Sequence, residues 1–206
     1  MVRREEGRKG KGGESSRRRA ETTGGGRGSD IWNRRATTRP VPLSEGQVVE
    51  ICWGELQRRR EPGELIAAAS AFASARGLTA QLFDASALAG EEHLRSAAIH
   101  ALRAMERGMG RTSSLAMEIL LYASGRRQIR DALKLVGVSG RTRRIAAVLI
   151  GRGARGRGKE LLKALGAAPC GPEAAGGRRA LARLGLRGRE IDEALEMVAL
   201  LDIERQ

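Results

Sequence analysis

The sequence predicts one α+β domain over residues 46–206, in which a small mixed sheet of three or four strands is surrounded by about six helices. Three observations predict this class. Short β-branched or apolar runs occur at three places, and amphipathic or alanine-rich stretches ending at glycine lie between them. Hydrophobic residues make up 41% of the chain but aromatic residues only 2%, so aliphatic side chains are expected to pack the core.

The first half of the domain contains two predicted strands and two predicted helices. Residues 48–53 form a β-branched run typical of a strand, and residues 79–83 form a second one that is closed by Asp84. Residues 64–76 are alanine-rich, begin with an acid and end at Gly77, which indicates a short helix. Residues 91–107 carry apolar side chains three and four positions apart, as an amphipathic helix does.

The second half begins with a nearly all-apolar helix over residues 115–123, which is expected to be central and buried. Ser114 is a candidate N-cap for it, and Gly125 ends it. A further helix is predicted over residues 127–136, closed by Gly137, and a third strand over residues 144–150. The remaining predicted helices cover residues 158–165, 178–184 and 190–200, and the sequence around 169–172 predicts no definite element.

Residues 1–45 are predicted to be a disordered Arg/Gly-rich tail. They contain 12 basic and 6 acidic residues and almost no apolar side chains before Ile31, so they cannot bury enough surface to offset the entropy of ordering. No uncharged apolar run is long enough to span a bilayer, and the N-terminus lacks the apolar core of a signal peptide. A soluble, cytoplasmic protein is therefore expected.

Positive charge points to nucleic acid as a partner. The chain has 38 Lys+Arg against 24 Asp+Glu, a formal net charge of +14, and 33 of the basic residues are arginine. Arginine makes planar, bidentate contacts with phosphate, so this excess suits RNA binding. A GC-rich genome or a hot habitat would raise the arginine content as well.

A glycine-rich stretch follows the third predicted strand. Residues 151–156 spell GxGxxG, and residues 153–159 spell GxxxxGK. Glu160 stands where a phosphate-binding loop carries Ser or Thr, and fewer than 60 residues remain to complete a dinucleotide-binding sheet. The stretch between Gly151 and Lys159 is therefore predicted to be a flexible basic loop that can contact RNA phosphate. A small nucleotide-binding enzyme using this loop remains an alternative.

The sequence offers little for catalysis. His93 and His100 lie seven residues apart with no third ligand nearby, so no metal site is expected. Cys52 is expected in the core and Cys170 in a turn, neither beside an activating group. The prediction is a protein without enzymatic activity and without a cofactor.

Glu118 interrupts the apolar helix over residues 115–123. A buried carboxylate needs a partner, because an isolated buried charge is costly. An arginine beyond the Ser124-Gly125 break could supply one: Arg126, Arg127 or Arg130. The pattern leaves open a structural salt bridge or a carboxylate that orients arginines for RNA or a partner protein.

Four stretches together resemble one known family: residues 94–102, residues 117–129 (MEILLYASGRRQI), residues 132–137 and residues 191–203 (IDEALEMVALLDI). In this order they resemble the PRPK-binding regulatory subunit of the KEOPS complex, in its archaeal form. The specific part is a glutamate in an apolar helix, a Ser-Gly break and an Arg-Gln-Ile restart. The resemblance covers residues 46–206 and does not extend to the tail.

The resemblance implies a role that composition does not show. KEOPS installs the threonylcarbamoyl group on the adenosine beside the anticodon of tRNAs that read codons beginning with A. This subunit is not its catalyst: it binds the complex's small atypical kinase/ATPase and, in archaea, the 3′ CCA end of tRNA. The resemblance also implies a mixed sheet with helices around it. A monomer is expected when the chain is isolated.

Site residues follow by position in the shared motifs. Ile191, Leu195, Val198 and Leu201 match the last helix and are expected at the kinase interface, although one face of that helix must pack on its own domain. Glu118 matches the helix carboxylate and is expected to orient an arginine. The residues expected to contact tRNA lie near helix ends around the shared motif: Arg95, Arg111, Arg126, Arg127 and Gln128. A general RNA-binding protein acting through its basic tail is a further alternative.

Overall fold

The computed structural model describes residues 41–42, 46–188 and 190–203. Among these residues, five strands and seven α-helices follow one another, with two short 3₁₀ turns. In chain order the elements are β1 (Val41–Pro42), β2 (Val48–Leu56), α2 (Pro62–Ser74), β3 (Thr79–Asp84), η2 (Ala85–Ala87), α3 (Glu91–Glu106), α4 (Leu115–Ser124), α5 (Ile129–Val136), β4 (Arg144–Gly151), α6 (Gly158–Ala164), β5 (Ala167–Cys170), η3 (Pro172–Ala174), α7 (Arg178–Leu184) and α8 (Asp192–Ile203).

The strands form one sheet in the order β1-β2-β4-β3, and β5 pairs with β2 beside β1. Every described pair is antiparallel; β2 and β4 align Val48 with Gly151, and β3 and β4 align Thr79 with Ile150. The predicted α+β class is thus confirmed, with two differences. The sheet is antiparallel rather than mixed. It has a fifth strand, β5, because part of the stretch around residues 169–172, for which the sequence predicts no definite element, forms the end of this short strand.

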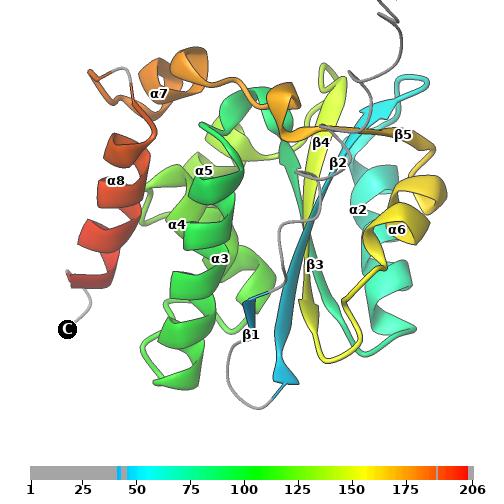
Figure 1. The fold of residues 1–206 in the computed structure, drawn as a ribbon, viewed down its shortest axis with the longest axis horizontal. Coiled ribbons are helices and arrows are strands. Elements are labelled where there is room, and N and C mark those ends of the chain that lie inside the picture. The colour runs from blue at the N-terminus through cyan, green and yellow to red at the C-terminus, as the bar shows by residue number, and fades with distance from the viewer. Residues whose placement is uncertain (1–40, 43–45, 189, 204–206) are drawn as a thin grey trace, which may run out of the picture.

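Helices cover both faces of the sheet (Figure 1): α3, α4, α5 and α8 lie on one side, and α2 and α6 on the other. The central strand β4 is buried along both faces. Ala146, Val148 and Ile150 join the core beneath α3 and α4, whereas Ile145 and Leu149 join the core beneath α2 and α6. This double burial explains why β4 reads as a continuous apolar run without alternation.

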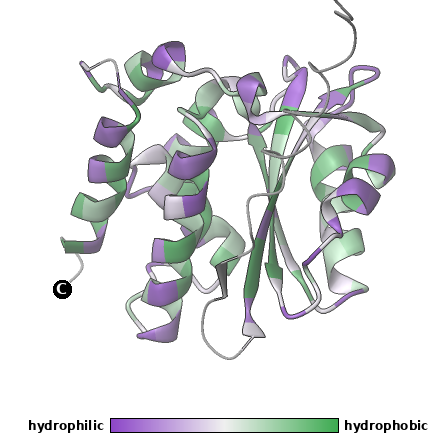
Figure 2. Ribbon diagram, in the orientation of Figure 1, coloured by the Kyte–Doolittle hydropathy of each residue, from purple (hydrophilic) through white to green (hydrophobic). Residues whose placement is uncertain are grey.

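Side chains sort by the layer in which they lie (Figure 2). Hydrophobic residues follow the sheet and the inward faces of the helices, and hydrophilic ones follow the outer faces and the loops. Most ring side chains take part in the core, with Phe83 and Tyr122 fully buried and Trp53 nearly so. No helix in the described part of the chain is long and apolar enough to cross a membrane.

The tail predicted over residues 1–45 lies almost wholly outside the described residues. Val41 and Pro42 are the exception, because they form β1 and pair with Val49 and Val48 of β2. The predicted domain boundary at position 46 stays a prediction.

Candidate functional site

The junction between α4 and α5 is the centre of the candidate site. Gly125 ends α4 in the left-handed conformation, with φ of 66°, and the amide of Arg126 donates to the carbonyl of Leu121. A Cβ on Gly125 would come within 2.4 Å of Met197 Sδ on α8. The positive φ favours glycine here, and Met197 of α8 packs directly against the turn.

The helix α5 begins at Ile129, two residues later than predicted. Arg126, Arg127 and Gln128 therefore form a short non-helical link between two helices, and all three are exposed. The guanidinium of Arg126 also donates to the carbonyl of Leu184, the last residue of α7, at 3.4 Å. The structure thus brings three of the five predicted tRNA-contacting residues together.

The other two predicted tRNA contacts lie elsewhere. Arg111 is exposed in the loop before α4, so it is separated from Arg126 by the length of that helix, about 15 Å. Arg95 lies in the second turn of α3, where its guanidinium forms an ion pair of 2.8 Å with Glu91. Only 13% of the Arg95 side chain is exposed, so it is a poor candidate for contact with RNA.

Glu118 is fully buried, as the sequence predicts, and it holds the loop before α4. Its carboxylate accepts hydrogen bonds from the backbone amides of Arg111 and Thr112, both at 3.1 Å, and from the Thr112 hydroxyl at 3.2 Å. Hydrogen bonds of this kind stabilise a buried carboxylate. Through these bonds Glu118 positions the backbone of Arg111, and the predicted contact with an arginine side chain stays a prediction.

Part of the kinase interface predicted on the last helix, α8, faces the helix's own domain. Val198 is fully buried and Leu201 is 6% exposed, so these two side chains pack within the domain and are poorly placed to contact a partner. Ile191 and Leu195 are half-buried. The exposed apolar residues of α8 are instead Leu200, at 58%, and Ile203, at 65%.

Sequence reasoning missed this outer face because α8 is apolar on more than one side. Beside it a concavity of about 360 Å³ opens toward the α4–α5 junction. Gly125, Arg127, Met197 and Leu200 are among the residues that line it. Two of the four stretches that carry the family resemblance, residues 117–129 and 191–203, thus meet at one surface.

The glycine-rich loop is already occupied by a carboxylate of the protein itself. Glu50 on β2 accepts hydrogen bonds from the amides of Gly156 and Gly158, the latter at 2.6 Å. These are amides that a bound phosphate would need, so this contact argues against the alternative of a nucleotide-binding enzyme.

The two cysteines come together although they are far apart in sequence. Cys52 on β2 and Cys170, which ends β5 rather than lying in a turn, line one pocket of about 470 Å³. Burial, then Glu50 and Cys170, raise the pKa of the Cys52 thiol to about 12. Burial and neighbouring carboxylates also raise the pKa of Cys170, so neither thiol is activated.

The histidines are built into the helical layer. His93 is fully buried, and its Nδ1 accepts a hydrogen bond from the amide of Ala89 at 3.3 Å. Burial lowers the pKa of His93 to about 4, so the ring is neutral at pH 7. His100 lies 3.5 Å from the carboxylate of Asp202. The described residues contain no group of three His, Cys, Asp or Glu side chains that could hold a metal ion.

A family model matches more than half of the chain. The family model described as kinase binding protein CGI-121 matches residues 64–175, from the third residue of α2 to the residue after η3. The matched segment includes the α4–α5 junction and Glu118. A comparison with curated proteins finds no match.

Proposed function

The chain belongs to the CGI-121 family of kinase-binding proteins, and from this membership we propose that it is the non-catalytic KEOPS subunit that docks on and regulates the complex's atypical kinase. In this proposal the chain also holds the 3′ CCA end of tRNA and so supports threonylcarbamoyladenosine modification next to the anticodon. It acts in the cytoplasm, follows the archaeal form of the family and is a monomer when isolated.

The exposed apolar side of α8 is the observation that carries the kinase-docking proposal. Leu200 and Ile203 lie within one turn of each other and are the two most exposed large hydrophobic residues of the described chain. Met197 continues this side toward the concavity beside Gly125. Exposed apolar side chains beside a shallow groove are typical of a helix that a protein partner covers.

The test compares two single substitutions that introduce the same charge. Leu200→Glu is expected to weaken binding of the full chain to the kinase subunit at least tenfold in calorimetric titration. Ile66→Glu is the matched control, because Ile66 is 50% exposed on α2, on the other side of the sheet (Figure 1). Equal affinities for the two variants would contradict docking through α8.

For tRNA, the proposed contacts are Arg126, Arg127 and Gln128. These three exposed side chains lie on one short link between helices, where arginine and amide groups can bind phosphates and the open edges of single-stranded bases. Arg111 lies too far along α4 to contact the same nucleotides, and we place it against a different part of the RNA. Arg95 is left out of the proposed contact set because of its ion pair with Glu91.

The tRNA proposal is tested with intact tRNA and tRNA that lacks its terminal CCA, at about 150 mM salt, where nonspecific phosphate binding is reduced. The unmodified chain should prefer intact tRNA, and Arg126→Ala with Arg127→Ala should remove that preference without unfolding the domain. Ser113→Ala, an exposed change in the loop before α4, is the control. A preference that survives the double substitution would refute the assignment.

A further inference from the structure

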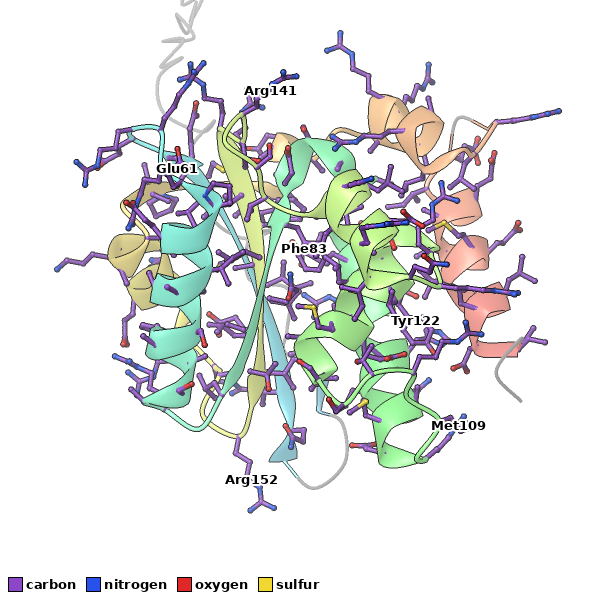
Figure 3. All side chains as sticks on the ribbon, turned by 180° about the vertical axis from the view of Figure 1, so that it is seen from behind. Glu61, Phe83, Met109, Tyr122, Arg141 and Arg152 are labelled. Carbon is purple, nitrogen blue, oxygen red and sulfur yellow. The ribbon has the colours of Figure 1, made fainter. Side chains whose placement is uncertain are left out.

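Five arginines line a groove at the end of the sheet where β4 begins. They come from two segments that are far apart in the sequence: Arg141, Arg143 and Arg144 from the loop into β4, and Arg178 and Arg179 from the start of α7. The groove has a volume of about 610 Å³, and small residues form much of the rest of its lining. Figure 3 shows Arg141 at this end of the molecule and Arg152 at the opposite end.

Hydrogen bonds fix both segments in place. Thr142 is 4% exposed, and its hydroxyl accepts from the Ser139 amide at 2.9 Å and donates to Asp84 at the end of β3 at 3.2 Å. The amide of Gly176 donates to the carbonyls of Ala85 and Leu88, at 3.1 and 2.9 Å. A Cβ on Gly176 would come within 2.0 Å of the Ser86 carbonyl oxygen, so only glycine allows α7 to start this close to the sheet. The five arginines are therefore carried on a rigid frame.

The charge of the groove is not balanced within the domain. Throughout the described residues, ion pairs engage other arginines, such as Arg60, Arg95 and Arg157, and none is formed by the five groove arginines. Asp84 is the one carboxylate lining the groove, and it already accepts hydrogen bonds from Ser86 and Thr142. Two arginines and no acid in the first turn of α7 also oppose the helix dipole. Folding stability does not explain this arrangement.

We propose that this arginine groove binds the phosphodiester backbone of a base-paired RNA stem. Phosphate matches the guanidinium group in charge and geometry, and five such groups on a fixed frame suit a polyanion. The groove has no aromatic lining on which unpaired bases could stack. It also lacks the large apolar side chains that anchor a protein partner, which favours RNA over an acidic protein.

The groove and the α4–α5 junction lie at the two ends of α7. Arg178 and Arg179 begin this helix, and the Leu184 carbonyl that ends it accepts a hydrogen bond from Arg126. The seven residues of α7 span about 10 Å. A tRNA whose CCA end lies at Arg126 and Arg127 could thus present its acceptor stem to the groove, so this part of the inference rests on the proposed function.

The experiment uses the full chain and a labelled, blunt-ended RNA hairpin that has no CCA end. The groove variant carries Arg143→Gln, Arg178→Gln and Arg179→Gln. The control carries Arg103→Gln, Arg107→Gln and Lys163→Gln, three exposed basic residues that do not line the groove, so the two variants have equal net charge. Circular dichroism melting verifies that both are folded. The groove variant should lose at least tenfold in hairpin affinity, and its log–log salt slope should fall by about 3.

The outcomes separate this inference from the proposed function. Equal losses of hairpin affinity in the two variants would overturn the proposal that RNA binds in the groove, because they would show a response to net charge alone. Unchanged hairpin binding with weakened binding to the kinase subunit would also overturn it, in favour of a protein surface. If the unmodified chain ignores CCA but its hairpin binding still depends on the groove arginines, the tRNA-end proposal fails and the groove stands.

Discussion

The hydroxyl of Tyr122 donates a hydrogen bond of 2.9 Å to the carboxylate of Asp202. This bond joins α4, the helix that carries the specific family motif, to the final turns of α8. His100 on α3 lies 3.5 Å from the other carboxylate oxygen, so three helices converge on Asp202. The outer face of α8, with Leu200 and Ile203, is positioned by this contact.

Tyr122→Phe is predicted to destabilise the domain and loosen α8. The buried ring is retained, so the expected loss in free energy of unfolding is that of one hydrogen bond to a charged group, about 2 kcal/mol. Urea unfolding of the unmodified chain, Tyr122→Phe, Asp202→Asn and the double variant gives a double-mutant cycle. The double variant should lose less free energy of unfolding than the sum of the two single losses, and strict additivity would show that the hydrogen bond contributes nothing.

Glu118→Ala is predicted to free the loop before α4. Two backbone amides and a hydroxyl lose their acceptor, so the free energy of unfolding should fall by about 2–3 kcal/mol. All three bonds go to one carboxylate oxygen, Oε2, so Glu118→Gln keeps an acceptor for them and should cost less than Glu118→Ala. Hydrogen exchange gives the local measurement: the amides of Arg111 and Thr112 should exchange faster in Glu118→Ala, and unchanged exchange would contradict the role of Glu118.

His93 is predicted to make the domain less stable in acid. Its pKa is about 4 in the folded state because of burial, against about 6.5 in the unfolded chain. Between these values the unfolded state binds more protons, so stability is full above pH 6.5 and decreases as the pH falls toward 4. The decrease attributable to this ring is about 3 kcal/mol at pH 4. His93→Asn should flatten the pH dependence by that amount, and parallel curves for the two proteins would rule it out.

Cys52 is predicted to resist alkylation in the folded protein. With a pKa of about 12, its thiolate fraction at pH 8 is about 1 in 10,000, whereas an ordinary thiol is partly ionised. Iodoacetamide at pH 8 should therefore modify Cys52 at a negligible rate in buffer and rapidly in urea. Mass spectrometry of the peptide that contains Cys52 measures both rates. Similar rates in the two conditions would contradict the buried, neutral thiol.

Local patterns predict most of the elements. The strand starting at Val48 and the helix ends at Gly77 and Gly125 agree with the structure within a few residues, because backbone conformation there is set by neighbouring residues. Local patterns do not predict which residues are buried by segments that are distant in the sequence. An apolar run at β4 is compatible with a parallel or an antiparallel strand, and only the pairing with β2 and β3 decides between them.

The candidate site was less predictable than the fold. The motif from Glu118 to Ile129 locates the α4–α5 junction in the sequence, but not the face of α8 that meets it. Leu200 and Leu201 are adjacent in sequence and equally apolar, yet one is 58% exposed and the other 6%. Their difference depends on how α8 packs against α3 and α4.

The sequence by itself determined the fold class, the order of the elements, the basic character of the chain and the motif that indicates its family. These properties depend on composition and on residues within a few positions of each other. Tertiary structure alone decided that Glu50 fills the glycine-rich loop, that Glu118 holds the backbone of Arg111, and that Arg143 and Arg179 line one groove. Each of these contacts joins side chains to partners that only packing and hydrogen bonding of the folded chain bring within reach.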